Sequence, residues 1–384
     1  MGDYDFNIFQ QIYCLSMMTG FVSKQTGSEQ FLQDKLKECL DEALPELPGS
    51  WSISWGPRVY QELNPEEEDK SDESDKRGPD NVWFAAVDDT QKVCVVAIAG
   101  TASNSDADIY QDITVSKVVD FDAWVELWSL YGIPEPYQSA PTQETASTLP
   151  FCAKGICVGV WNVMNNSSTR YGEVIRIDQY LRSLDPSYTI VVTGHSLGGA
   201  LAPLVALGLA KSGLVDSNNL KVLPSAGVSP GNEKFAADYA ATFLKDPESA
   251  TDYQVYNTDY YNEFDIVPQA WSVDPEDDRN LDIIQDKIIH TDNTILAIEV
   301  SIIVGNAKLA SHNSQIRYTP LPGQRFTGPT PQDPIHDKDE LRNVLGNEHV
   351  CAYWDELGIT DFMNKFDEKF SKRIGVHDTS QARE

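Results

Sequence analysis

The chain has 384 residues, and its 59 acidic side chains against 29 basic ones give a formal net charge of −30 at pH 7. A charge of this sign repels nucleic-acid phosphates and anionic membrane surfaces, so we do not expect a nucleic-acid-binding protein. The six cysteines form no C-x-x-C pair, which gives no sign of a zinc site, and we expect no metal or organic cofactor. The length suits a single large domain spanning residues 1–384 and leaves the oligomeric state open.

Residues 1–80 are predicted to hold two helices and an acidic loop. The helices are expected at 6–20 and 28–44, where apolar residues recur at helical spacing. The loop, residues 64–80, contains nothing that could enter a core and is expected to be solvated. No basic residue precedes Lys24, whereas a secretory leader begins with a positive segment. We therefore expect no signal peptide, and a protein that is cytoplasmic or exported by a leaderless route.

Two apolar strands, 82–88 and 92–99, are predicted to form a hairpin. Residues 102–150, which follow, are expected to be a lid or cap insertion. Four apolar residues in this insertion have spacings of three and four, so a short helix would present them on one face. That face could meet lipid, and packing onto the core is the alternative. These four candidate substrate-binding residues are Trp124, Leu127, Trp128 and Tyr131.

The most informative local pattern joins a β-rich run at 188–193 to an Ala- and Leu-rich helix at 197–211. The linking residues fit G-x-S-x-G, which places Ser196 on a strand-to-helix turn so tight that it requires glycines on either side. A nucleophilic serine occupies this position in hydrolases. The preceding residues, 151–184, are predicted to form one long helix.

Strands and helices alternate after this turn, with a strand predicted at 220–229, a helix at 231–245 and a strand at 253–257. The alternation favours an α/β fold with a mostly parallel sheet and helices on both faces. The C-terminal third is expected to be irregular, ending in a mobile tail at 370–384. Its longest apolar stretch, 294–310, contains a glutamate and is predicted to be too short and too polar to span a membrane.

A serine hydroxyl becomes a good nucleophile only when an imidazole takes its proton and a carboxylate orients that imidazole. In α/β hydrolases the three groups follow one another as Ser, acid and His. Asp265 is the preferred acid after Ser196, because apolar neighbours are expected to bury it, and Glu263 is the alternative. His349 is the preferred base, because a loop meets an apolar run there, and His312 is the second choice.

The oxyanion that develops during ester cleavage needs two hydrogen-bond donors. We expect one to be the backbone N–H of Leu197, directly after the nucleophile. The other is expected from the loop that follows an early strand, at Thr101. His195 precedes the nucleophile, and neighbouring side chains on this turn point apart, so we expect it to be structural.

Taken together, these motifs resemble those of the class 3 lipases, the fungal-lipase type within the α/β-hydrolase fold. The resemblance extends over roughly residues 90 to 355, and several matches in the same order are more specific than any one of them. The matching segments are V-V-T-G-H-S-L-G-G-A-L-A at 191–202, Gly100-Thr101, Lys154-Gly155, S-P-G-N-E-K-F-A at 229–236, D-I-V-P at 265–268, and His349 followed by Tyr353-Trp354.

The resemblance implies hydrolysis of long-chain acylglycerol esters under a lid, whose position corresponds to residues 106–114. It assigns the same catalytic and oxyanion residues, Ser196, Asp265, His349, Thr101 and Leu197. The chain departs from the family pattern at Ala99, where the family usually has arginine. It also has three residues, instead of two, between the histidine and the following tyrosine.

The sequence thus predicts a serine ester hydrolase, foremost a triacylglycerol lipase that works through an acyl-enzyme. Its expected partners are a lipid or ester substrate and, transiently, a lipid interface. The alternatives are a phospholipase or short-chain esterase of the same fold, a non-catalytic lipase-like binding module, and a toxin-like lipid hydrolase exported without a leader.

Overall fold

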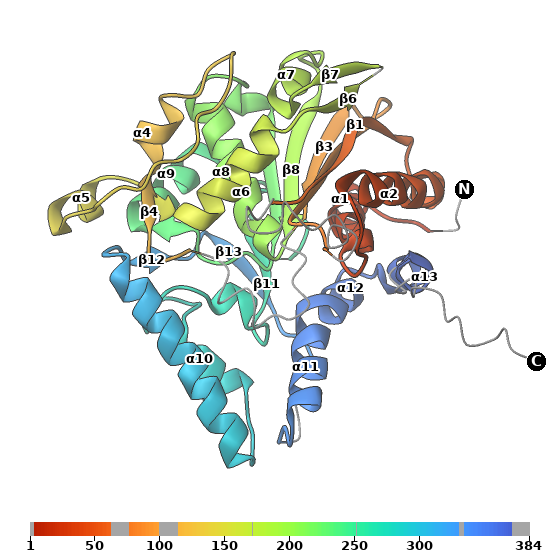
Figure 1. Ribbon diagram of the computed structural model, residues 1–384. Helices are drawn as coiled ribbons and strands as arrows, with labels where there is room; N and C mark the ends of the chain where they lie inside the picture. The colour runs from red at the N-terminus through yellow and green to blue at the C-terminus, as the bar shows by residue number, and fades with distance from the viewer. Residues whose placement is uncertain are drawn as a thin grey trace, which may run out of the picture.

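The structure is a computed structural model that describes residues 4–62, 77–99, 114–170, 172–250, 252–329 and 334–370. Its centre is a seven-stranded sheet with the order β1-β2-β3-β8-β9-β11-β13 (Figure 1). The first three strands are antiparallel, and every later neighbour pair is parallel. Their bounds are β1 Trp51–Tyr60, β2 Asn81–Asp88, β3 Val93–Ile98, β8 Thr189–His195, β9 Leu220–Ser225, β11 Asp259–Asn262 and β13 Gly323–Phe326.

Two smaller sheets lie outside the central one. One has four short strands in the order β12-β10-β5-β4, and the other is a hairpin of β6 and β7. Their bounds are β4 Val118–Asp120, β5 Phe151–Ala153, β6 Ser168–Arg170, β7 Glu173–Ile175, β10 Gly231–Asn232 and β12 Tyr318–Thr319.

Helices cover both faces of the central sheet, and each face has its own core. Successive strand residues point to opposite faces, so Val96 and Val192 belong to one core while Val95 and Val191 belong to the other. Helices α6 to α9 contribute to the first core, and α1, α2, α12 and α13 to the second (Figure 1). The predicted α/β fold with a mostly parallel sheet and helices on both faces is confirmed.

The helices in chain order include several short single turns and two π-helical turns, η6 and η7. Their bounds are α1 Ile8–Met18, η1 Thr19–Val22, α2 Glu29–Ala43, η2 Leu44–Glu46, α4 Phe121–Val125, α5 Gln143–Thr148, α6 Lys154–Asn165, α7 Ile177–Arg182, α8 Leu197–Lys211, η4 Ser217–Asn219, α9 Glu233–Thr242, η5 Val267–Gln269, η6 Ile284–Ile288, α10 Thr294–Asn313, α11 Lys338–Gly346, η7 Asn347–Cys351, α12 Ala352–Glu356 and α13 Thr360–Phe370.

The long helix predicted at 151–184 is wrong, because this segment contains β5, α6, the β6–β7 hairpin and α7. The first three residues pair with β4 and β10 in the four-stranded sheet. Gly172, with φ +87°, forms the turn of the hairpin that follows α6. The prediction failed because apolar residues recur at nearly helical spacing along the whole segment. That spacing gives no sign of the places where the chain leaves one element and reverses direction.

The strand predicted at 253–257 is also misplaced, since β11 begins at Asp259, two residues after the predicted strand ends. Pairing with both neighbours sets its register, with Tyr260 opposite Ser225 on one side and Gln324 on the other. Strand β1 was not predicted at all. It carries a bulge beside a Gly56-Pro57 pair that interrupts the alternation of side chains.

The C-terminal third is helical and not irregular as predicted. Its longest helix, α10, runs for 20 residues, three beyond the apolar stretch expected from the sequence. Within the described part of the chain, α10 is long and apolar enough to cross a membrane by length and composition. The prediction that this stretch is too short was therefore wrong. A packed helix can pass the same test, so length and composition alone do not make α10 a membrane span.

Candidate active site

Ser196 lies on the turn between β8 and α8, as the sequence pattern predicts. Its backbone has φ 62° and ψ −128°, a conformation that non-glycine residues rarely adopt and that costs about 1–3 kcal/mol. Its N–H donates to the carbonyl of Ser225 in the neighbouring strand β9 at 3.0 Å. The surrounding structure therefore holds the strained turn, and the side chain reaches the surface of a pocket.

Two glycines make this turn possible. A Cβ on Gly194 would lie 2.3 Å from the carbonyl oxygen of Gly198 and 2.7 Å from that of Ile98. A Cβ on Gly199 would lie 2.4 Å from the carbonyl oxygen of Ser225. Backbone cannot yield to such contacts as a flexible side chain can, so the motif's glycines are set by close packing of strand against helix.

Asp265 is buried at 1% exposure, on the turn after β11. Its Oδ1 accepts a hydrogen bond from the N–H of Val267 at 2.9 Å. Its Oδ2 lies 2.8 Å from Nδ1 of His349 and accepts a hydrogen bond from the hydroxyl of Tyr353 at 3.0 Å. His349 and Tyr353, which follow Asp265 by 84 and 88 positions in the chain, thus converge on one of its carboxylate oxygens.

His349 lies on η7, a π-helical turn between α11 and α12, and not at the end of a loop as predicted. A π-helical turn bonds residue i to i+5 and so contains one more residue than an α-helical turn. This accommodates the extra residue between His349 and Tyr353, because both side chains reach the same oxygen of Asp265. The departure from the family spacing therefore coincides with a local change in helix type.

His195 contacts the backbone of the base, and the two rings lie 4.7 Å apart between centroids. Its Nε2 lies 2.8 Å from the carbonyl oxygen of His349, and its Nδ1 lies 3.0 Å from the hydroxyl of Ser225. A carbonyl only accepts, so Nε2 carries the proton and Nδ1 accepts from the serine hydroxyl. Burial, and then the neighbouring His349, hold the pKa of His195 well below its usual value, so the ring is neutral.

Asn262 and Glu348 support the site and were not anticipated from the sequence. The amide of Asn262 donates to both the carbonyl and the side chain of Glu348, at 3.0 and 2.7 Å. Its Oδ1 accepts from the N–H groups of Phe264 and Gly328. Burial raises the pKa of Glu348. An asparagine three residues before the acid was a usable sign, since Asn side chains often close turns of this kind.

The alternative acid and base lie elsewhere. Glu263 hydrogen-bonds to Thr327 and lies 3.7 Å from Arg325. His312 is exposed near the C-terminal end of α10. The structure thus brings together Asp265 and His349, the preferred pair.

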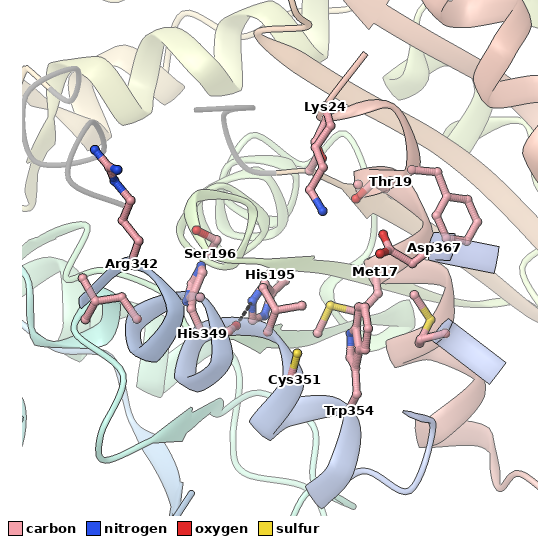
Figure 2. A pocket seen from close by; sticks show the side chains of 18 of the residues that line it. Met17, Thr19, Lys24, His195, Ser196, Arg342, His349, Cys351, Trp354 and Asp367 are labelled. Carbon is pink, nitrogen blue, oxygen red and sulfur yellow. Dashed lines mark hydrogen bonds between the residues drawn. The ribbon is translucent and has the colours of Figure 1, made fainter. Parts of the chain in front are cut away.

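Ser196, His195 and His349 line one pocket with a volume of about 730 Å³, within the usual range for ligand sites (Figure 2). The pocket lies between the N-terminal segment α1–η1 on one side and α10 and α11 on the other. Much of its wall is apolar, including Met17, Phe21, Leu296, Val300, Ile303, Leu341, Trp354 and Met363. Among the residues that the structure describes, no three His, Cys, Asp or Glu side chains form a metal-binding group.

The oxyanion residues are only partly placed. Leu197 is the first residue of α8, where helix geometry leaves N–H groups without a partner inside the helix. The partial positive charge at the N-terminus of a helix also favours an anion beside this N–H. Thr101 lies outside the described residues, as do residues 102–113, which include nearly all of the predicted family lid.

For Trp124 and Trp128 the lipid-facing alternative is wrong and packing onto the core is confirmed, because both rings are in the core, at 0% and 5% exposure. They pack edge to face with centroids 5.1 Å apart, and a Cβ on Gly208 would lie 2.3 Å from the Trp128 ring. Gly208 is twelve residues after the nucleophile in α8, about 18 Å along the axis. The remaining two residues, Leu127 and Tyr131, are exposed. In the described part of the insertion, core packing explains the two tryptophans.

The sheet order, the strained serine turn and the Asp–His pair behind it define an α/β hydrolase of the serine type. The family model for "Lipase (class 3)" matches residues 137–274, a segment that includes the serine turn and Asp265. This match agrees with the resemblance to the class 3 lipases seen in the sequence and supports a carboxylic ester hydrolase.

One solved structure supports the fold, and two others align over shorter stretches. The structure described as M37 lipase aligns over 95% of this chain and 98% of its own, with a TM-score of 0.65 and 19% identity. At that identity the likeness supports the fold alone. The LIP2 lipase of Yarrowia lipolytica aligns over 68% of this chain and 73% of its own, with a TM-score of 0.42 and 20% identity. Lipase II of Rhizopus niveus aligns over 50% and 56%, with a TM-score of 0.33 and 22% identity.

Proposed function

We propose that this chain hydrolyses acylglycerol esters through an acyl-enzyme on Ser196, with His349 as the base and Asp265 as the acid that orients it. The observation that carries the proposal is the contact of His349 Nδ1 with a buried Asp265 oxygen at 2.8 Å, beside the pocket that Ser196 also lines. A carboxylate accepts, so Nδ1 carries the proton and Nε2 is the basic nitrogen of the neutral ring.

In the first half-reaction, the Ser196 oxygen attacks the ester carbonyl carbon while His349 Nε2 takes the hydroxyl proton. The carbonyl electron pair moves onto oxygen, and the N–H of Leu197 stabilises the resulting charge. When the carbonyl re-forms, the bond to the alcohol breaks, and the alcohol leaves with the proton from His349. The products of this step are an acyl-enzyme and the freed glycerol hydroxyl.

In the second half-reaction, His349 takes a proton from water, and the hydroxide oxygen attacks the acyl carbon. Collapse of the second tetrahedral intermediate releases the fatty acid and returns the proton to Ser196. Asp265 stabilises the imidazolium in both halves and keeps its own charge. The second donor to the Oδ2 atom of Asp265, the hydroxyl of Tyr353, helps to fix that carboxylate in place.

An uncharged acyl substrate fits the pocket better than a charged one, because its wall is largely apolar. The net charge of −30 also disfavours anionic lipid surfaces. Both observations support neutral acylglycerols over anionic phospholipids as the substrate.

The proposal is tested by measuring fatty-acid release from emulsified triacylglycerols, phosphatidylcholine and dissolved p-nitrophenyl esters of graded chain length. Ser196→Ala should abolish hydrolysis of every substrate that the unaltered chain cleaves. Ser212→Ala, a serine at the other end of the same helix, should retain it. A preference for phosphatidylcholine over triacylglycerol would replace the lipase proposal with a phospholipase, and hydrolysis that survives Ser196→Ala would refute the assignment of the nucleophile.

A further inference from the structure

Helix α10 exposes a straight row of large aliphatic side chains, which we call the aliphatic row: Ile295, Ile298, Ile302 and Leu309. Each of them is more than half exposed, from 54% to 69%. Their spacings of three, four and seven place them within one narrow stripe of the helix surface. The row extends from Ile295 to Leu309, 15 residues and about 21 Å along the helix. Figure 1 shows α10 on the outer edge of the molecule, away from the central sheet.

The opposite face of the same helix is also apolar, and it is buried. Leu296, Val300, Val304 and Ala307 all belong to the first core. Leu296 and Val300 also line the pocket that holds Ser196. One wall of the pocket is therefore the inner face of a helix whose outer face is the aliphatic row. A helix that is apolar all round is normally covered on all sides, and in the described part of the chain this one is covered on one side.

The charges on α10 do not interrupt the row. Glu299 forms an ion pair with Lys338 of α11 at 2.8 Å, and Lys308 pairs with Asp282. Both pairs are neutral overall, so the row offers no charge to attract a charged partner. The chain's net charge of −30 opposes an anionic surface in any case.

The size of the row argues against a second protein molecule as its partner. Four aliphatic side chains present on the order of a few hundred Å², whereas a stable protein interface buries roughly 800 Å² on each partner and has a polar rim. A helix that lies flat in a lipid surface needs only such a row of aliphatic side chains. The composition of α10, apolar enough for hydrocarbon yet only 28% buried in its most apolar window, points the same way.

We propose that the aliphatic row of α10 docks on an uncharged lipid surface and so holds the mouth of the Ser196 pocket against its substrate. This inference rests on the proposed function, since it takes the neutral acylglycerol surface as the partner. The row, and not the tryptophans of residues 114–150, is then the part of the described chain that contacts lipid.

The test measures partition of the full chain onto a triolein emulsion coated with phosphatidylcholine, in a Ser196→Ala background so that the lipid stays intact. The row variant is Ile298→Ser with Ile302→Ser. The control is Val174→Ser with Leu244→Ser, two apolar residues elsewhere in the chain that are even more exposed, at 73% and 72%. The row variant should lose roughly tenfold or more in partition, while the control should stay within about twofold of its parent.

With Ser196 intact, the row variant should hydrolyse emulsified triolein more slowly by a similar factor. Its rate on dissolved p-nitrophenyl butyrate should not change. Thermal unfolding midpoints, together with the single variant Ile302→Ser, show whether any loss reflects folding.

Equal partition of the row and control variants would overturn the docking proposal. A row variant that partitions normally but changes from dimer to monomer would also overturn it, and would identify a second copy as the partner. If the unaltered chain cleaves no ester, the proposed function fails, but partition of the Ser196→Ala chain still tests docking by itself.

Discussion

Replacing His195 with glutamine should remove a pH dependence from the stability of the fold. His195 is partly buried at the pocket wall, and desolvation and His349 hold its pKa well below the usual value, so it is neutral. In the unfolded chain a histidine titrates near 6.5. As pH falls below 6.5 the unfolded state therefore gains a proton that the folded state does not, and the free energy of unfolding decreases. The stabilisation is complete above that pH and is lost below it.

The size of this effect follows from the one-proton difference between the two states. Between pH 7.5 and 5.5, a single histidine that titrates only when unfolded lowers the free energy of unfolding by about 1.4 kcal/mol. Glutamine can still donate to the carbonyl of His349 but does not titrate. It leaves the hydroxyl of Ser225 without its ring acceptor, which should cost about 1–2 kcal/mol at every pH.

Urea denaturation at pH 7.5 and 5.5 measures the difference, with His312→Gln as an exposed control. Burial raises the pKa of Asp259 to about 6, despite Arg279 beside it. That carboxyl loses stabilisation as pH rises through 6, the opposite direction from His195, but it is present in every variant and cancels in the comparison. If the unaltered chain and His195→Gln lose the same free energy of unfolding between pH 7.5 and 5.5, the neutral state of His195 in the fold is refuted.

Three further predictions concern single positions. Asp265→Asn should lower kcat on a dissolved ester by about 10³–10⁴-fold, since the imidazole loses its orienting carboxylate, and Tyr353→Phe should lower it less; equal kcat values in all three proteins would contradict the contacts described. Trp128→Ala should lower the free energy of unfolding by about 3–5 kcal/mol, measured in urea, with KM on emulsified and dissolved esters unchanged, whereas a loss confined to emulsions would restore the cap hypothesis. Gly194→Ala should give little folded protein on expression, because its methyl would lie 2.3 Å from a backbone oxygen; a normal yield with normal activity would show that the turn is less tight than the structure has it.

Local patterns predicted the serine turn well, because everything that makes it is within a short stretch of chain. The glycines, the β-branched strand before Ser196 and the small-residue helix after it act on one another directly. The segment 151–184 failed for the opposite reason. Whether Phe151 begins a helix or a strand depends on pairing with β4 and β10, whose residues lie far away in the sequence.

The candidate site shows the same division. Residue chemistry narrowed the acid to Asp265 or Glu263 and favoured His349 as the base, but only the fold could bring an aspartate and a histidine 84 positions apart into contact. The π-helical turn that carries His349 has no recognisable sequence pattern. Spacing grouped Trp124 and Trp128 on one short helix, but α4 ends at Val125, before Trp128. Both rings do pack together, yet spacing does not say whether they meet the core or the solvent.

The most direct test of the account is labelling with a serine-directed phosphonate, followed by mass spectrometry of the peptides. The account predicts a single adduct on Ser196 in the unaltered chain, no adduct in Ser196→Ala, and strongly slowed labelling in His349→Ala. An adduct on another residue, or labelling at the same rate without His349, would contradict the proposed proton transfer between the two side chains.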